Sequence, residues 1–204
     1  MPLHLHIFEE RYRIMVRHIL DHDGLLGIVL IHQGLEALGP LPEPYRVGML
    51  ARMVEYETLP DGRMNITVMG IDRFNILDID TVSQPFLLGT VETSPIELPR
   101  MIQVHRKARQ LSREILAYLK ELSRDNTDEI DVSNFSPPDD PMSLVFLGAS
   151  LLQIPPTEKQ PILEAPSVFD MMDIVERLYR RENGLMRTIN ATGELPARRA
   201  AWLN

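Results

Sequence analysis

The residues best suited to chemistry in this sequence are histidines, four of which form two closely spaced pairs. His4 and His6 would share one face of a strand, and His18 and His22 are i, i+4 neighbours on one face of a helix. The zinc-protease pattern H-E-x-x-H fails, because Ile19 occupies the glutamate position. We therefore expect no metal site, and a solvated helix end whose dipole favours the second histidine pair.

Paired carboxylates, Glu9-Glu10 and Asp139-Asp140, are the next candidates for acid–base chemistry. Adjacent residues on a helix do not face each other. Both pairs also stand where a helix is expected to begin, and acidic side chains there stabilise the helix dipole. We interpret both pairs as helix starts and assign them no catalytic role.

Motifs for nucleophiles and nucleotides are missing. Residues 148–150 (Gly-Ala-Ser) approach G-x-S-x-G, but two leucines follow, and Ser150 is expected to bond back to the backbone of a buried helix. The sequence contains no G-x-x-x-x-G-K-[ST] or G-x-G-x-x-G. It has no cysteine, which excludes a thiolate nucleophile. The sequence therefore predicts no enzyme and no cofactor.

Composition and charge limit the partners of this 204-residue chain. No apolar run approaches the ~20 residues that cross a bilayer, and the first residues are not a signal peptide, so we expect a cytoplasmic protein without a membrane partner. Residues 1–99 hold 7 Arg, no Lys and 14 acidic residues, a net charge of −7. Because phosphate contacts need Lys and Arg, we expect no nucleic acid partner.

The first half of the chain predicts short strands around one helix at 9–22. Strands are expected at 3–8, 26–31, 46–59, 64–69, 73–79 and 86–92. Pro60 to Arg63 predicts a hairpin turn, Asp23-Gly24 the helix end, and Gly70 a break between two strands. Strands at this spacing are typical of a small barrel or sandwich.

The second half predicts helices. Apolar residues recur with helical spacing over 101–122, a buried helix follows at 139–152, a short helix begins at 158, and a further helix begins at 167. Ser167 and Asp170 predict a capping box, and Asn183-Gly184 a helix end near Glu182. We expect one domain over 1–97, a second over 98–184, and a tail over 185–204 that is a frayed helix or disordered.

Several ordered motifs resemble the Lon protease N-terminal domain family. They are the opening string MPLHLHIFEERY, the stretch YRVGMLA at 45–51, the hairpin and G-x-x-R-F string over 60–74, and KQPILE at 159–164. The resemblance spans 1–183 and implies an α+β protein, with a PUA-like β-barrel followed by a C-terminal α-helical bundle. It also implies a role in binding unfolded or tagged polypeptides.

The resemblance implies that the partners are polypeptide clients, or a protease or chaperone. It does not decide whether the chain forms a homo-oligomer. In full-length Lon an ATPase and a Ser-Lys peptidase follow this domain, whereas this sequence stops at Asn204. Two alternatives are an RNA-binding PUA-like module and a small metal-dependent hydrolase. The acidic first half argues against RNA.

Six residues match the family motifs and are the candidate binding residues: Phe8, Glu9, Arg11, Tyr12, Arg73 and Phe74. Each also has a structural interpretation. The aromatic residues suit a core, and the charged residues suit ion pairs that hold the helix to the barrel, which we favour over ligand contact.

Relatives in this family carry a further strand before the segment that matches Met1. We favour a start assigned too late, at an internal methionine, because an open sheet edge is costly. The alternative is an edge left free, which could pair with a peptide strand.

Overall fold

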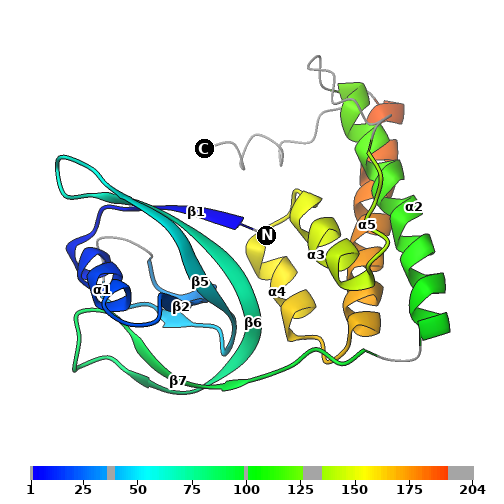
Figure 1. The fold of residues 1–204 in the computed structure, drawn as a ribbon. Coiled ribbons are helices and arrows are strands. Elements are labelled where there is room, and N and C mark those ends of the chain that lie inside the picture. The colour runs from blue at the N-terminus through cyan, green and yellow to red at the C-terminus, as the bar shows by residue number, and fades with distance from the viewer. Residues whose placement is uncertain (1, 36–39, 99–100, 126–134, 193–204) are drawn as a thin grey trace. The chain divides into compact units, whose positions relative to one another are not determined.

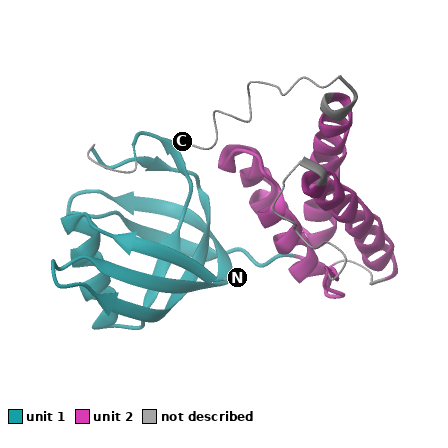
Figure 2. Cartoon of the chain, turned by 90° about the horizontal axis from the view of Figure 1, so that it is seen from above, with its two compact units in different colours: residues 1–96 teal, residues 97–204 magenta. Residues whose placement is uncertain are grey.

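The computed structural model describes residues 2–35, 40–98, 101–125 and 135–192. The chain divides into two compact units, residues 1–96 and 97–204 (Figure 2). The first unit contains all the described strands and one helix, and the second contains the other helices. The predicted α+β class is confirmed, and each unit is considered by itself.

The first unit is a curled antiparallel sheet, a half-barrel, with a helix packed on it (Figure 1). Its elements are β1 (Pro2–Ile7), α1 (Glu10–Leu20), β2 (Leu25–Ile28), β3 (Ile31–Gln33), β4 (Glu43–Pro44), β5 (Val47–Thr58), β6 (Met64–Asp80) and β7 (Leu88–Thr93). The main sheet has the order β1-β6-β5-β2, β7 also pairs with β6, and β3 and β4 form a separate two-stranded sheet.

Strand β6 is continuous, so the predicted break at Gly70 is wrong. Leu50 of β5 pairs with Asp72, and the next residue, Ala51, pairs with Gly70, which leaves Ile71 as an extra residue. This is a β-bulge, which bends a strand without ending it. Glycine at this point therefore marks a bend in one strand of 17 residues.

The core of the first unit lies between α1 and the concave face of the sheet. Val16 and Ile19 of α1 are buried with Leu26, Ile66 and Val68. Their helical spacing on α1 and their alternation on β6 follow from the two periods of side-chain direction. The hairpin between β5 and β6 turns at Gly62, whose φ of 81° suits glycine, as the Asp-Gly pattern predicts.

The second unit contains α2 (Met101–Asp125), α3 (Pro141–Leu151), α4 (Pro156–Glu164) and α5 (Val168–Thr192). Its core includes Leu111 and Ile115 of α2 and Met171, Met172 and Tyr179 of α5, all 0% exposed. The methionine pair Met171 and Met172 therefore fills the core. Among the described residues, no helix combines the length and apolar character needed to span a membrane.

The sequence predicts the start of α5 correctly but not its end. At the start, Ser167 Oγ accepts a hydrogen bond from the Asp170 N–H at 3.2 Å, which confirms the N-cap bond of the predicted capping box. The predicted end near Glu182 is wrong, since α5 continues through Gly184 to Thr192. Asn183 is buried and donates to Glu114 Oε2 at 3.1 Å, so packing against α2 overrides the local breaker signal. Of the predicted tail, 185–192 is helical and 193–204 lies outside the described residues.

Candidate functional site

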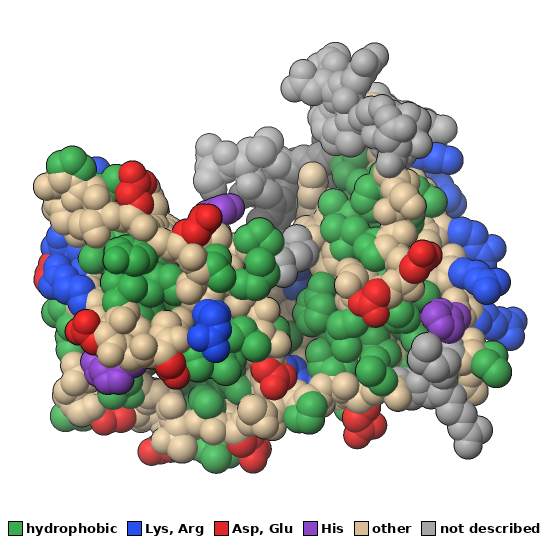
Figure 3. Space-filling view, in the orientation of Figure 1, with side chains coloured by type: hydrophobic (Ala, Val, Ile, Leu, Met, Phe, Trp, Pro, Cys, Tyr) green, Lys and Arg blue, Asp and Glu red, His purple; other side chains and the backbone are tan. Residues whose placement is uncertain are grey.

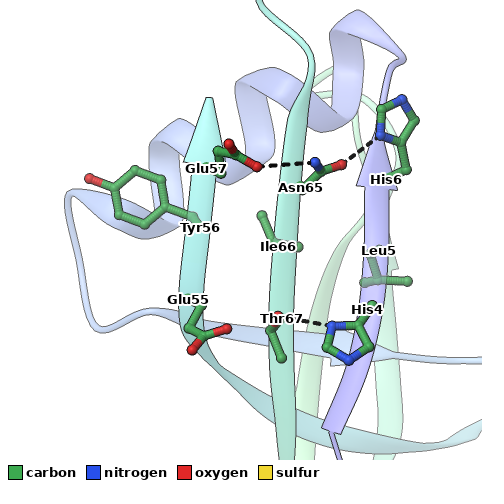
Figure 4. A pocket seen from close by; sticks show the side chains of 9 residues that line it. All are labelled: His4, Leu5, His6, Glu55, Tyr56, Glu57, Asn65, Ile66 and Thr67. Carbon is green, nitrogen blue, oxygen red and sulfur yellow. Dashed lines mark hydrogen bonds between the residues drawn. The ribbon is translucent and has the colours of Figure 1, made fainter. Parts of the chain in front are cut away.

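A shallow groove lies where β1, β6 and β5 run side by side (Figure 4). Its volume is about 670 Å³, which is in the range of pockets that hold small molecules or side chains. The lining residues are His4, Leu5, His6, Glu55, Tyr56, Glu57, Asn65, Ile66 and Thr67. They come from two segments far apart in the sequence, the first strand and the β5–β6 hairpin.

The strand register arranges the polar residues of the groove in two parallel rows. His6 pairs with Asn65, which pairs with Glu57 on the far strand. The His6 Nδ1–H donates to Asn65 Oδ1 at 2.7 Å, and Asn65 Nδ2 donates to Glu57 Oε2 at 3.3 Å (Figure 4). The row is exposed, so its histidine and carboxylate groups are accessible to a ligand.

The second row repeats this arrangement two residues away. His4 pairs with Thr67, and Thr67 pairs with Glu55. His4 Nδ1 lies 3.1 Å from Thr67 Oγ1. The groove therefore has imidazole rings along its β1 side and carboxylates along its β5 side, with hydroxyl and amide groups between them (Figure 4).

Phe8 is the one predicted binding residue beside this groove. Its ring stacks on that of His6, with ring centroids 6.3 Å apart. The interpretation of Phe8 as a core aromatic is wrong, since its side chain is 52% exposed. Ile7 faces the core at the end of β1, and strand alternation turns the next residue outward.

Glu9, Arg11 and Tyr12 form a local cluster at the start of α1. Arg11 Nε lies 3.1 Å from Glu9 Oε2, and its guanidinium carbon lies 4.8 Å from the centroid of the Tyr12 ring. Tyr12 is partly buried against the core of the first unit. The ion pair between Glu9 and Arg11 joins the helix cap to the first helical turn.

Arg73 and Phe74 are buried, at 5% and 4% exposure. Arg73 Nε donates to the backbone carbonyl of Ser94 at 2.7 Å, and Nη2 donates to that of Pro95 at 3.3 Å. Burial lowers the pKa of Arg73, and the charge of Asp72 opposes that shift. In these contacts Arg73 anchors the chain that follows β7 by backbone hydrogen bonds. Phe74 is a core aromatic, as predicted.

The sequence missed most of the groove. Glu55, Glu57, Asn65 and Thr67 were not candidates, although they alternate on the two strands that flank the predicted hairpin. The sequence signal was a pair of acidic residues at i, i+2 on one strand and a pair of polar residues at i, i+2 on the other, because residues at that spacing share one face of a sheet. The spacing of His4 and His6 indicates a shared strand face but not which residues lie opposite them.

The groove can therefore recognise a ligand by hydrogen bonds, charge and aromatic contact.

The other residues that the sequence singled out lie outside the groove. Ser150 is on α3, where its Oγ donates to the backbone carbonyl of Leu147 at 2.8 Å, as predicted. Its side chain is exposed. Asp140 caps α3 through a 2.8 Å bond from the Ser143 N–H, as predicted for the Asp139-Asp140 pair. Within the described ranges, no three His, Asp or Glu side chains are grouped to hold a metal ion.

Comparison with known families gives a match over most of the chain. The family described as ATP-dependent protease La (LON) substrate-binding domain matches residues 1–180. Two solved structures are similar in fold, each at 18% identity. The N-terminal domain of a Mycobacterium avium complex Lon protease has a TM-score of 0.63 and matches 88% of this chain and 90% of its own. A Lon N-terminal domain protein from Xanthomonas campestris has a TM-score of 0.57, with coverages of 85% and 86%.

Similar curated proteins are much longer than this chain. A Lon protease from Desulfovibrio desulfuricans is 30% identical over 148 residues, which is 70% of this chain and 16% of the relative. A Lon protease from Phenylobacterium zucineum is 27% identical over 161 residues, 78% of this chain and 20% of the relative. The chain thus spans about a fifth of the length of these relatives or less.

Proposed function

Because this chain belongs to the family of ATP-dependent protease La (LON) substrate-binding domains, we propose that it is a non-catalytic module that binds polypeptides. The match over residues 1–180 supports recognition of substrate chains. A PUA-like form of the half-barrel and a bundle form of the helical unit are parts of the same proposal. The cytoplasmic location and the partner protease or chaperone remain predictions.

The groove on the first unit is the surface we assign to this binding. The carrying observation is the exposed Phe8 ring stacked on His6, at the end of two rows of unburied polar side chains. An extended peptide combines apolar side chains with backbone donors and acceptors. An exposed aromatic ring beside histidine, amide and carboxylate groups complements both parts of such a ligand.

The charge of the groove disfavours the RNA alternative. Glu55 and Glu57 line one side, and phosphate groups would be repelled by their carboxylates. The same carboxylates favour peptide segments that carry lysine or arginine. No contact in the described residues favours the alternative of a metal-dependent hydrolase.

The experiment measures binding of a fluorescently labelled, permanently unfolded protein by anisotropy. Phe8→Ala and His6→Ala should each weaken binding by about tenfold, because the first removes the exposed aromatic ring and the second the imidazole on which it stacks. Leu77→Ala is the matched control, since Leu77 is 56% exposed but is not a groove residue. Absence of binding at high micromolar concentration, or equal losses for all three variants, would contradict the proposal.

A further inference from the structure

The outward face of α2 carries a stripe of positive charge in the helical unit. Its exposed cations are Arg106, Arg109, Arg113 and Lys120. At 3.6 residues per turn these positions fall on one narrow face. The opposite face contains the buried residues Val104, Ala108, Leu111, Ile115 and Leu119. Figure 3 shows Lys and Arg side chains gathered along α2.

The charges of this stripe are not compensated by their neighbours. Several other cations of the unit have carboxylate partners: Lys107 pairs with Asp173 and Glu176, and Arg181 pairs with Glu158. Arg180 pairs with Glu114 and Glu176. The four cations of the stripe have no ion pair within the part of the chain that the structure describes. A chain of net charge −8 therefore keeps a positive surface on one helix.

The spacing of the stripe fits a second helix. Positions 106, 109, 113 and 120 lie on the three- and four-residue steps of a heptad seam, in which Leu116 takes the step between Arg113 and Lys120 and Ile102 comes one step before Arg106. The cations span about 21 Å along α2, or about four turns. A partner helix with carboxylates at the same steps would face each cation in turn, and arginine can bind a carboxylate through two parallel hydrogen bonds.

We propose that the outward face of α2 is a docking site for an acidic helical segment of a partner polypeptide. Two other polyanions fit the stripe less well. Single-stranded nucleic acid is held largely by aromatic stacking, and the stripe contains no aromatic residue. A membrane surface needs apolar residues to insert, and this face offers two large ones, Ile102, which is 86% exposed, and the half-buried Leu116.

The test uses the full 204-residue chain and a labelled helical peptide with Glu at its a and d positions. A second peptide with Gln at those positions is the ligand control. The test variant is Arg109→Gln with Arg113→Gln. Its matched control is Arg46→Gln with Arg187→Gln, which removes the same charge from exposed side chains outside the stripe. Circular dichroism verifies that each variant is folded.

We expect the test variant to bind the Glu peptide about tenfold more weakly at low salt, and the control variant to bind within about twofold of the parent chain. Binding should weaken as salt increases. Equal affinity for the Glu and Gln peptides, or equal losses in both variants, would overturn the proposal. So would tighter binding of a DNA duplex or of anionic vesicles than of the Glu peptide at physiological salt.

This inference concerns a surface separate from the sheet groove. Phe8→Ala should leave binding of the Glu peptide unchanged. If Phe8→Ala abolished it, the acidic peptide would be a ligand of the groove and the α2 site would be refuted. The two proposals can therefore fail independently.

Discussion

Lys107 and Glu176 form an ion pair between α2 and α5, with Nζ 2.7 Å from Oε2, although the glutamate side chain is only 2% exposed. Gln110 Nε2 donates to Oε1 of the same carboxylate at 2.7 Å, and Arg180 also pairs with it. A buried carboxylate is tolerated only with such partners. The pair therefore fixes how the two longest helices pack.

Lys107→Met should destabilise the helical unit by about 3 kcal/mol, because it leaves a buried carboxylate with one fewer cation. The double variant Lys107→Met, Glu176→Gln should recover part of that loss. Urea unfolding followed by circular dichroism gives the free energies of unfolding. Strictly additive losses would show that the two residues are not coupled.

Acid titration should reveal a low pKa for Asp80. Its side chain hydrogen bonds with Ser83, and its Oδ1 accepts the Ser83 and Val82 N–H groups at 3.0 and 2.8 Å, which lowers the pKa to about 2. The contribution of the charged form is present above the usual value of 3.8 and is lost as pH falls towards 2. NMR titration measures the pKa directly. Below about pH 4 the free energy of unfolding should change less with pH in Asp80→Asn than in the parent chain. The same pH dependence in both proteins would contradict this account.

Two glycine substitutions should have opposite effects. A Cβ on Gly48 would lie 2.8 Å from the backbone oxygen of Ile28 and 2.8 Å from Cζ of Phe74, so Gly48→Ala should cost about 2 kcal/mol or more. A Cβ on Gly184 would meet nothing within 4 Å, and this glycine is inside α5. Gly184→Ala should therefore stabilise the chain by up to about 1 kcal/mol. Thermal unfolding of both variants checks the signs.

Tyr179→Phe should cost about 1–2 kcal/mol of unfolding free energy. The Tyr179 hydroxyl donates to the backbone carbonyl of Gly148 at 2.7 Å, and its ring packs against Tyr118 with centroids 5.2 Å apart. Burial raises the pKa of this phenol. Tyr56→Phe is the control, because Tyr56 is 57% exposed and should change stability by less than about 0.5 kcal/mol. Similar losses in both variants would refute the role of the buried bond.

Local patterns predicted most element types but not where they end. The sequence indicated the hairpin at Gly62 and the cap at Ser167, because both depend on neighbouring residues alone. Gly70 and Gly184 were misinterpreted as breakers. At Gly70 a bulge keeps β6 paired, and at Gly184 the contacts of Asn183 and Met186 keep α5 helical. Tertiary packing decided both.

The candidate site was predicted only in part for a similar reason. Alternation correctly indicated that His4 and His6 share a face, but not that Thr67 and Asn65 would lie opposite them. That pairing depends on the register of strands distant in the sequence, which no local pattern encodes. Motif positions such as Arg73 and Phe74 proved to be buried, so they mark the scaffold of the first unit.

Strand β6 pairs with three strands, β1, β5 and β7, so the pairing of all three requires β6 to be in place. During synthesis β1 leaves the ribosome well before its partner, since Ile7 pairs with Met64 and Pro2 with Met69. The β1–β6 pairing is a contact of long sequence separation, and such contacts are associated with slower folding. The backbone groups of β1 that pair with β6 therefore lack these partners until β6 has been synthesised.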